Sequence, residues 1–522
     1  MTFATSRIET AVSADAYAAR ARARNILVCA GVLLLTVAST GAMLRFGAKP
    51  ALVAPLAVGL VAAAVLARPV IGLYLLLSGA LLFEQFAVSG VSSITSELRF
   101  FENLSSFTDF PLRLSLADVL IVLVLVSLLL RRLTGTADRL RGGPLLWPVL
   151  GYGAVFILGL GIGIARGASW NDLAALAELR APVHLCALYF LTANLVRTSG
   201  QAWVVLRILV AVTAIKAVQG LWTFQDLRSS GIAFETVTPH EEVLFFNLVP
   251  ILALAMLVLG VRTSLRRWLL LLTPVALAIE TVTQRRVGFV ALAAGVAITL
   301  LLLRAERPRR TMLVMGVGAV VLSAYAALAW NDPGWIAEPL RPLRSIVASQ
   351  DLSERDRLSN LWRSIENANI AFTISQLPLT GVGLGQQYLF QQEPQALDAF
   401  VYWRYITHNA IFWLWLKAGV LGFFAFWFLV GQAILVGGGF FRRLARPELK
   451  IIAIVPVALV AMQVVFSSVD LGLHYSRTMI VLGVALGLLA QLGAYAERNP
   501  AEASRAVSAL GLRPTADGRR GT

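Results

Sequence analysis

Long apolar segments recur along the chain, and they constrain its fold more than any other feature. A helix needs about 20 mostly apolar residues to cross the hydrocarbon core of a bilayer. Segments of about this length can be traced about fourteen times, and they cover residues 25–45, 50–67, 69–90, 114–131, 144–165, 181–197, 201–224, 243–261, 267–283, 287–304, 311–330, 409–434, 451–468 and 475–493. The sequence therefore predicts an all-α polytopic membrane protein with about 14 transmembrane helices.

Composition supports this class and excludes a water-soluble one. Hydrophobic residues make up 58% of the 522-residue chain and charged residues 14%, against about 25% charged residues in an ordinary soluble domain. The net charge of +16 could indicate a nucleic-acid partner. The arginines, however, lie in short clusters between the apolar segments, as they do beside the cytoplasmic face of a membrane. We therefore expect the lipid bilayer, and no nucleic acid, as a partner.

The basic clusters also predict an orientation in the membrane. Arginine and lysine concentrate in alternate loops, which the positive-inside rule assigns to the cytoplasm together with both chain ends. The arginines ahead of the first apolar segment resemble a signal anchor more than a cleaved signal peptide, whose apolar region is shorter. The predicted parts are a cytoplasmic N-terminal tail (1–24), transmembrane helices 1–11 (25–330), an extracytoplasmic catalytic loop (331–407), transmembrane helices 12–14 (408–493) and a cytoplasmic basic tail (494–522).

The loop over residues 331–407 is the longest polar segment between apolar ones. Loops of this length usually carry function or lack order. Ser353 and Asp356 match a helix start, and apolar residues follow at amphipathic spacing from Leu358 to Ile365. The loop is therefore predicted to contain short helices.

Adjacent arginines mark the end of one predicted helix on the extracytoplasmic side. Gln284-Arg285-Arg286 lies where clustered arginine is disfavoured. The arginines could simply extend along the interface, or their guanidinium groups could bind phosphate in a bidentate manner; the side of the membrane favours phosphate binding. Arg357 is a further basic candidate, because it opens the amphipathic helix of the loop.

His408-Asn409 stands where the long loop re-enters the membrane. A lone interfacial histidine is more often structural, but imidazole is the commonest general base, and the position directly after the loop favours a catalytic role. Three glycines in the loop, Gly381, Gly383 and Gly385, permit a tight turn. They do not form a dinucleotide-binding fingerprint, because no strand precedes them.

Other polar residues give weaker indications. His240-Glu241-Glu242 opens a predicted helix, but its spacing does not match a two-histidine zinc motif, and acidic residues suit a helix start. With four histidines and two cysteines in the chain, we expect neither a metal site nor a disulfide framework. Charged residues also interrupt apolar segments, and they either pair with each other or line a cleft; these are Glu84, Lys216, Glu280 and Lys417.

The order of these features resembles the O-antigen ligase and O-antigen polymerase superfamily. The similar region covers residues 270–435. It contains, in order, Gln284-Arg285-Arg286, the outer loop with Arg357, the sequence Pro378–Gly385, His408-Asn409 and the following helix. The family's arginine-bearing turn often reads Ser-Arg-Gly and here reads Gln-Arg-Arg-Val, so either arginine could be the equivalent one.

The resemblance implies a GT-C-like membrane glycosyltransferase of the bacterial inner membrane, with its active site facing the periplasm. Such enzymes take a glycan from an undecaprenyl-diphosphate-linked donor and pass it, with inversion and without a metal or other cofactor, to a hydroxyl of a glycan, lipid A core or protein. The residues that the resemblance assigns to catalysis are His408, Arg285 and Arg286. Those that it assigns to substrate binding are Arg357, Gly381, Gly383, Gly385 and Asn409.

The proposed chemistry fits these residue types. Guanidinium groups can stabilise the charge that develops on a departing diphosphate, and His408 can take the proton of the acceptor hydroxyl. A transporter or flippase of lipid-linked oligosaccharide is the alternative, since it also has many helices and intramembrane charges. The sequence shows no internal repeat, and its most distinctive polar segment is a single outer loop, which favours the enzyme. Ligase and polymerase are not distinguished.

Overall fold

The computed structural model describes most of the chain. The described residues are 50–86, 94–97, 99–106, 113–135, 139–167, 169–231, 236–330, 335–340, 342–344, 354–394 and 400–499, with a few single positions between them. The predicted helix over residues 25–45 and both predicted tails fall largely outside these ranges.

Regular secondary structure in the described part is helical, apart from one isolated bridge between Asn103 and Ser115. The chain divides into two compact units. The first, Met1–Gly79 with Phe100–Arg141, holds α2 (Pro50–Ala67), most of α3 (Pro69–Leu82), η1 (Leu104–Ser106) and α5 (Leu116–Leu133). The second, Ala80–Arg99 with Gly142–Thr522, holds the remaining helices. These are α4 (Ile94–Glu97), α6 (Leu146–Arg166), α7 (Asp172–Leu195), α8 (Ser199–Ser229), α9 (Glu242–Leu259), α10 (Ser264–Thr283), α11 (Arg286–Glu306), α12 (Pro308–Ala329), η2 (Trp335–Leu340), α14 (Glu354–Gln376), α15 (Ala410–Arg443), α16 (Pro447–Ser467) and α17 (Ser476–Arg498).

The all-helical polytopic class is confirmed, but the number of spans differs from the prediction. Nine helices of the described part are long and apolar enough to cross a membrane, namely α6, α7, α8, α9, α11, α12, α15, α16 and α17. Helices α5 and α10 are long enough, but each carries charged side chains at one or both ends. Helix α3 and the apolar part of α2 are shorter. The predicted count of fourteen therefore exceeds the nine helices that meet both criteria in the described residues.

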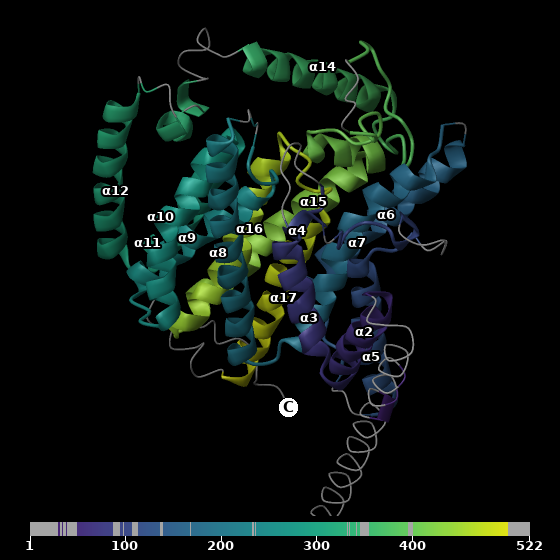
Figure 1. Cartoon of the computed structure of the whole chain (residues 1–522), viewed down its shortest axis with the longest axis horizontal. Helices are drawn as coiled ribbons and strands as arrows, with labels where there is room; N and C mark the ends of the chain where they lie inside the picture. The colour runs from purple at the N-terminus through teal and green to yellow at the C-terminus, as the bar shows by residue number, and fades with distance from the viewer. Residues whose placement is uncertain are drawn as a thin grey trace, which may run out of the picture. The chain divides into compact units, whose positions relative to one another are not determined.

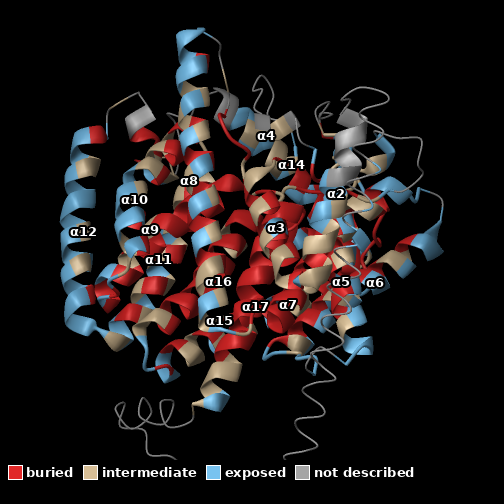
Figure 2. Ribbon diagram, turned by 60° about the horizontal axis from the view of Figure 1, so that its bottom comes forward, coloured by how far each residue is buried: buried red, intermediate tan, exposed pale blue. Residues whose placement is uncertain are grey.

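Burial within the second unit is uneven. Helices α9, α16 and α17 are buried along most of their length, whereas almost the whole surface of α12 is exposed (Figure 2). A helix that is apolar all round and unburied by protein needs lipid around it. The exposure of α12 is thus what a helix at the edge of a membrane bundle requires.

The basic loops of the second unit meet at one end. Lys450, which follows the α15–α16 turn, pairs with Glu306 at the end of α11. Arg310 donates to the carbonyl of Val258, near the end of α9, at 3.4 Å. Because α9, α11 and α15 each begin at the other end of the unit, the basic clusters are separated from the starts of these helices by the length of the bundle.

Helix α15 is interrupted by Gly419, whose φ is 64° and ψ −165°. The break leaves carbonyls on the preceding turn without helical partners, and the loop segment before α15 supplies them. The amide of Val382 donates to the carbonyl of Leu416 at 2.7 Å, and that of Gly383 donates to Lys417 at 3.0 Å. In return, the amide of Val420 donates to the carbonyl of Pro378 at 3.1 Å. The loop segment is thereby bonded into the membrane helix.

A buried ion pair holds the same segment to α7. Lys417 Nζ lies 2.8 Å from Glu178 Oε1, and neither side chain is exposed. The other carboxylate oxygen of Glu178 accepts from the amide of Gly385 at 2.6 Å, and Lys417 also donates to the carbonyl of Gln386. The sequence predicted that charged residues within apolar segments either pair with each other or line a cleft. Lys417 is paired, and so is Lys216, which pairs with Glu84.

The close approach of the loop to α6 generates a stability prediction. A Cβ at Gly163 would lie 2.0 Å from the carbonyl oxygen of Leu384, which is backbone, whereas a Cβ at Gly161 on the same helix meets nothing within 4 Å. We expect Gly163→Ala to lower the free energy of unfolding by about 1–3 kcal/mol, the usual cost of overpacking. Gly161→Ala should be neutral or slightly stabilising, because alanine favours helix by up to about 1 kcal/mol. Thermal unfolding in detergent measures the stability of both variants. Equal thermal midpoints for the two would contradict the close contact between Gly163 and Leu384.

Candidate active site

Polar residues from distant parts of the sequence converge at the end of the second unit where α9, α11, α15 and α17 begin. They come from the turn before α9, the α10–α11 turn, the residues before α15 and the α16–α17 loop. Helix α14 lies across this end, against the start of α15 (Figure 1). A helix, α14, covers the residues for which the amphipathic pattern predicts one, and it is longer than that pattern indicated.

The first group centres on His408, which immediately precedes the cap of α15. Its Nδ1 lies 3.2 Å from Glu366 Oε1 on α14, and its backbone amide donates to both oxygens of that carboxylate at 3.1 Å. The ring packs edge to face on Trp362 with 5.0 Å between ring centroids. A carboxylate only accepts, so Nδ1 carries a proton. Nε2 is left as the acceptor, on a side chain that is 23% exposed.

The second group centres on Arg285 in the α10–α11 turn. Gln284 before it has φ 56°, the one left-handed non-glycine residue among those described, and such a conformation costs about 1–2 kcal/mol. The turn makes Arg285 the N-cap residue of α11. The first amides of a helix and its dipole favour an anion. The strained turn therefore places a guanidinium group beside a helix start, both of which attract phosphate.

The third group is a chain of hydrogen bonds through His240. His240 Nδ1 lies 3.3 Å from Asp470 Oδ2 in the α16–α17 loop, and its Nε2 contacts Arg285 Nη2. The hydroxyl of Tyr475 donates to Asp470 Oδ1 at 3.2 Å. Burial by itself would raise the pKa of the Asp470 carboxyl. The hydrogen bond from His240 and the positive charge of Arg285 outweigh burial and lower that pKa well below its usual range. Asp470 is thus within electrostatic reach of both Arg285 and His408.

A third histidine, His474, lies close to these groups. His474 is 6% exposed, and its ring packs edge to face on Trp413 with 4.1 Å between centroids. Burial lowers the pKa of His474 to about 3, and the positive charge of Lys417 acts in the same direction. The ring is therefore neutral at ordinary pH.

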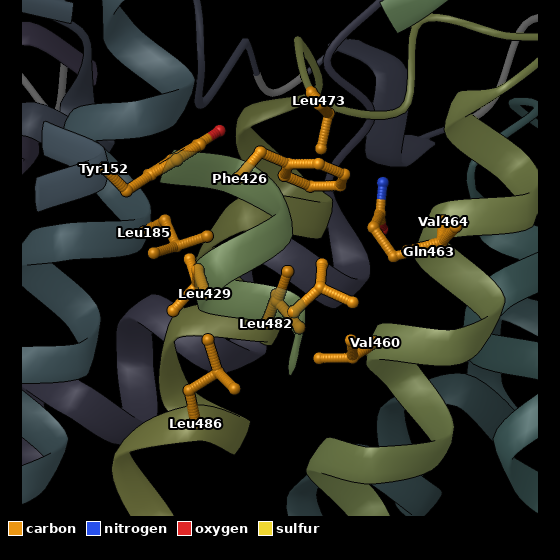
Figure 3. A pocket seen from close by; sticks show the side chains of 11 residues that line it. Tyr152, Leu185, Phe426, Leu429, Val460, Gln463, Val464, Leu473, Leu482 and Leu486 are labelled. Atoms are coloured by element: carbon orange, nitrogen blue, oxygen red, sulfur yellow. The ribbon is translucent and has the colours of Figure 1, made fainter. Parts of the chain in front are cut away.

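Apolar side chains lie below His474. Leu473, its neighbour in sequence, lines an apolar pocket with Phe426, Leu482 and other residues from α6, α7, α15, α16 and α17, among them Tyr152 and Gln463 (Figure 3). Since the polar groups of the α16–α17 loop lie directly above apolar packing, their interactions act at a lower effective dielectric than in water.

Comparison with known proteins agrees with the resemblance seen in the sequence. Residues 269–427 match the family model described as O-antigen ligase. The match supports the resemblance of this region to the O-antigen ligase and polymerase superfamily. No curated protein matches the chain. The region that matches the O-antigen ligase model runs from α10 through the first part of α15, and it includes Arg285, α14 and His408.

The structure brings some of the predicted O-antigen ligase site residues together and leaves others apart. Arg285 and His408 both lie at the group around Asp470. Arg286 is the first residue of α11 and is half-buried, and Arg357 is exposed on the N-terminal part of α14. Asn409 caps α15, because its side chain accepts from the amide of Phe412 at 3.1 Å.

The three glycines of the predicted substrate-binding turn have a packing role in the structure. Gly381, Gly383 and Gly385 are buried with positive φ. A Cβ at Gly383 would lie 2.3 Å from the amide nitrogen of Gly163. Their requirement for glycine therefore follows from the contact with α6, α7 and α15. Substrate contact by these glycines stays a prediction.

Sequence analysis missed Glu366, Asp470 and Tyr475, and it assigned His240 no role in a site. Glu366 lies mid-helix among ordinary polar residues, and Asp470 lies in a short turn between two apolar segments. The one available signal was the location of Asp470 between the last two membrane helices on the same predicted side as His408. Glu241 and Glu242, next to His240, instead pair with the buried Arg477 at 2.8 and 2.7 Å.

The low pKa of His474 predicts a specific pH dependence of stability. Between about pH 6.5, where an unfolded histidine titrates, and the native value of about 3, the unfolded chain binds more protons than the native one. Stability therefore falls as pH is lowered through this range, by up to about 1.4 kcal/mol per pH unit. We expect His474→Phe to flatten the dependence of the thermal midpoint between pH 7.5 and 4.5. If the thermal midpoints of variant and wild type fell equally with pH, the conclusion that the buried ring of His474 is neutral would be wrong.

Proposed function

We propose that this O-antigen ligase- or polymerase-type glycosyltransferase transfers a glycan from undecaprenyl diphosphate to an acceptor hydroxyl at the periplasmic face of the bacterial inner membrane. The observation that carries the proposal is the convergence of Arg285 and His408, distant in sequence, on one end of the bundle around Asp470. Arg285 supplies a group that can bind phosphate, and His408 supplies a hydrogen-bond acceptor for a hydroxyl.

Arg285 and the start of α11 form the proposed donor site. A guanidinium group binds phosphate through two parallel hydrogen bonds, and the helix start adds amide donors and a favourable dipole. Arg286, as the first residue of α11, is the second cation of this proposed site. Arg357, exposed on α14, is proposed to contact the substrate from the side of the long loop.

His408 is the proposed general base. Glu366 fixes the tautomer that leaves Nε2 free to accept a proton. In the transfer step the acceptor oxygen forms a bond to the anomeric carbon from the face opposite the leaving group, and its proton passes to Nε2. The carbon–oxygen bond to the diphosphate breaks, and its electron pair stays on the diphosphate, whose charge Arg285 stabilises. No metal or other cofactor takes part in this proposed step.

The separation of charges in the second unit supports the proposed orientation. The basic loops meet at the end of the bundle away from His408, and clustered arginine and lysine favour the cytoplasmic side. The end that carries Arg285 and His408 then faces the periplasm, where lipid-linked glycans of this family are used.

The role of His408 is tested by His408→Gln. Glutamine keeps hydrogen-bonding capacity but cannot act as a base at neutral pH, so we expect glycan transfer in membranes to fall by about 10²–10⁴-fold at unchanged protein level. Arg404→Gln is the matched control, because Arg404 lies in the same loop on a side chain that is 43% exposed, and it should transfer normally. Transfer by His408→Gln within a few-fold of wild type would reject the catalytic role.

The donor site is tested by Arg285→Lys and Arg286→Lys. Lysine keeps the charge but loses the planar fork, so we expect at least a tenfold loss of transfer in Arg285→Lys and a smaller loss in Arg286→Lys. The loss should be visible as accumulated lipid-linked glycan in the cell. Short accumulated units would indicate a polymerase and long chains a ligase. Normal transfer by the double lysine variant, with Arg404→Lys as the control for a surface arginine, would contradict the donor site.

A further inference from the structure

A second carboxylate–histidine pair lies at the proposed active site in addition to Glu366 and His408. It consists of Asp470 and His240, with 3.3 Å between Asp470 Oδ2 and His240 Nδ1. The two pairs come from different elements, since Glu366 is on α14 and Asp470 is in the α16–α17 loop. The proposed base uses only one of them, so the function of His240 needs a separate account.

The hydrogen bonds around Asp470 determine which nitrogen of His240 carries a proton. Asp470 Oδ1 accepts from the hydroxyl of Tyr475 at 3.2 Å and from the amide of Leu471 at 2.7 Å. The pKa of the Asp470 carboxyl lies well below its usual range, so the group is ionised and only accepts, and His240 Nδ1 is the donor to Oδ2. Asp470 thus holds the ring in one orientation, with Nε2 directed to Arg285.

The contact on the other side of the ring makes the state of His240 depend on Arg285. A guanidinium group has donors but no acceptor. As long as it contacts Nε2, that nitrogen accepts and the imidazole is neutral. If a diphosphate takes the guanidinium group as its own partner, Nε2 loses this donor and gains a neighbouring dianion. Both changes favour uptake of a proton at Nε2, because a nearby negative charge favours the charged imidazolium.

We propose that His240 is a residue of the leaving-group site, which becomes an imidazolium when a diphosphate binds Arg285 and donates its Nε2 proton to the departing diphosphate oxygen. This proposal rests on the proposed glycosyl transfer. The acceptor proton goes to His408, the new glycosidic bond forms, the old carbon–oxygen bond breaks, and the oxygen that keeps its electron pair receives the proton of His240. His408 then holds one proton more and His240 one fewer, and exchange with water restores both.

The charged groups around His240 are consistent with this exchange of protons. The groups that face it are Arg285 from the α10–α11 turn, Asp470 from the α16–α17 loop and Glu241 from its own turn, and His408 acts on the same carboxylate. The ring is 33% exposed, so a phosphate group can reach it. Asp470 positions the ring and stabilises its positive charge, and it does not itself contact the diphosphate.

The test measures proton uptake when inorganic pyrophosphate binds the purified full-length protein in detergent. Calorimetry in two buffers with different ionisation enthalpies gives the number of protons taken up at pH 7.5. We expect wild type to take up more protons than His240→Gln, and the variant to bind pyrophosphate about tenfold more weakly. His184→Gln, a histidine on α7 outside this site, is the matched control and should behave as wild type. Equal proton uptake in wild type and His240→Gln would overturn the proposal.

Two further measurements separate this proposal from the proposed function. If Arg285→Lys loses pyrophosphate binding and transfer while His240→Gln retains wild-type proton uptake, the role of His240 is wrong and the transferase proposal stands. If wild type binds neither pyrophosphate nor undecaprenyl diphosphate, the donor site itself is wrong. If His240→Gln does not fold, Asp470→Asn is the second variant that tests the proposal. It keeps the shape of the turn but removes the negative charge, so it should also lower proton uptake, and wild-type uptake in Asp470→Asn would overturn the proposal.

Discussion

The ion pair between Lys417 and Glu178 is the interaction on which the rest of the site depends. A charge inside a membrane bundle is costly and is usually paired, and here the pairing joins three parts of the chain. Lys417 belongs to the first part of α15 and Glu178 to α7, while Gly385 and Gln386 of the long loop complete the hydrogen bonds. His408 lies at the start of the same helix. Its position therefore depends on the placement of α15 by a buried charge.

The sequence predicted the all-helical class, because apolar length is a local signal, but it predicted about fourteen spans where nine helices of the described residues are long and apolar enough. It also predicted that Arg285 and His408 have a site in common, through the resemblance. It could not predict that Glu366 and Asp470 each hold a histidine, since an acidic residue on a polar helix or in a turn has no local pattern that reveals its partner. The glycines at 381, 383 and 385 show the opposite difficulty. The resemblance assigned them to substrate binding, but close packing against α6, α7 and α15 also requires glycine there.

The two carboxylate–histidine pairs differ in their surroundings, and this difference assigns their proposed roles. His408 has an aromatic ring of Trp362 beside it and a carboxylate at one nitrogen, which suits a group that must accept a proton from a neutral hydroxyl. His240 lies between a carboxylate and a guanidinium group, which suits a group whose charge changes with the occupancy of its neighbour. A histidine that is bonded to a carboxylate can thus accept a proton at one position and donate a proton at another, when its other neighbours differ.

The break of α15 at Gly419 restricts how the loop segment before α15 can move. The carbonyls released at the break are bonded by Val382 and Gly383, and Val420 is bonded by Pro378. Lifting this segment would leave several backbone groups without partners in an apolar interior, where each costs several kcal/mol. The foot of the loop is therefore fixed to the membrane helix. The loop is thus held on the side that leads into α15, at whose start His408 lies.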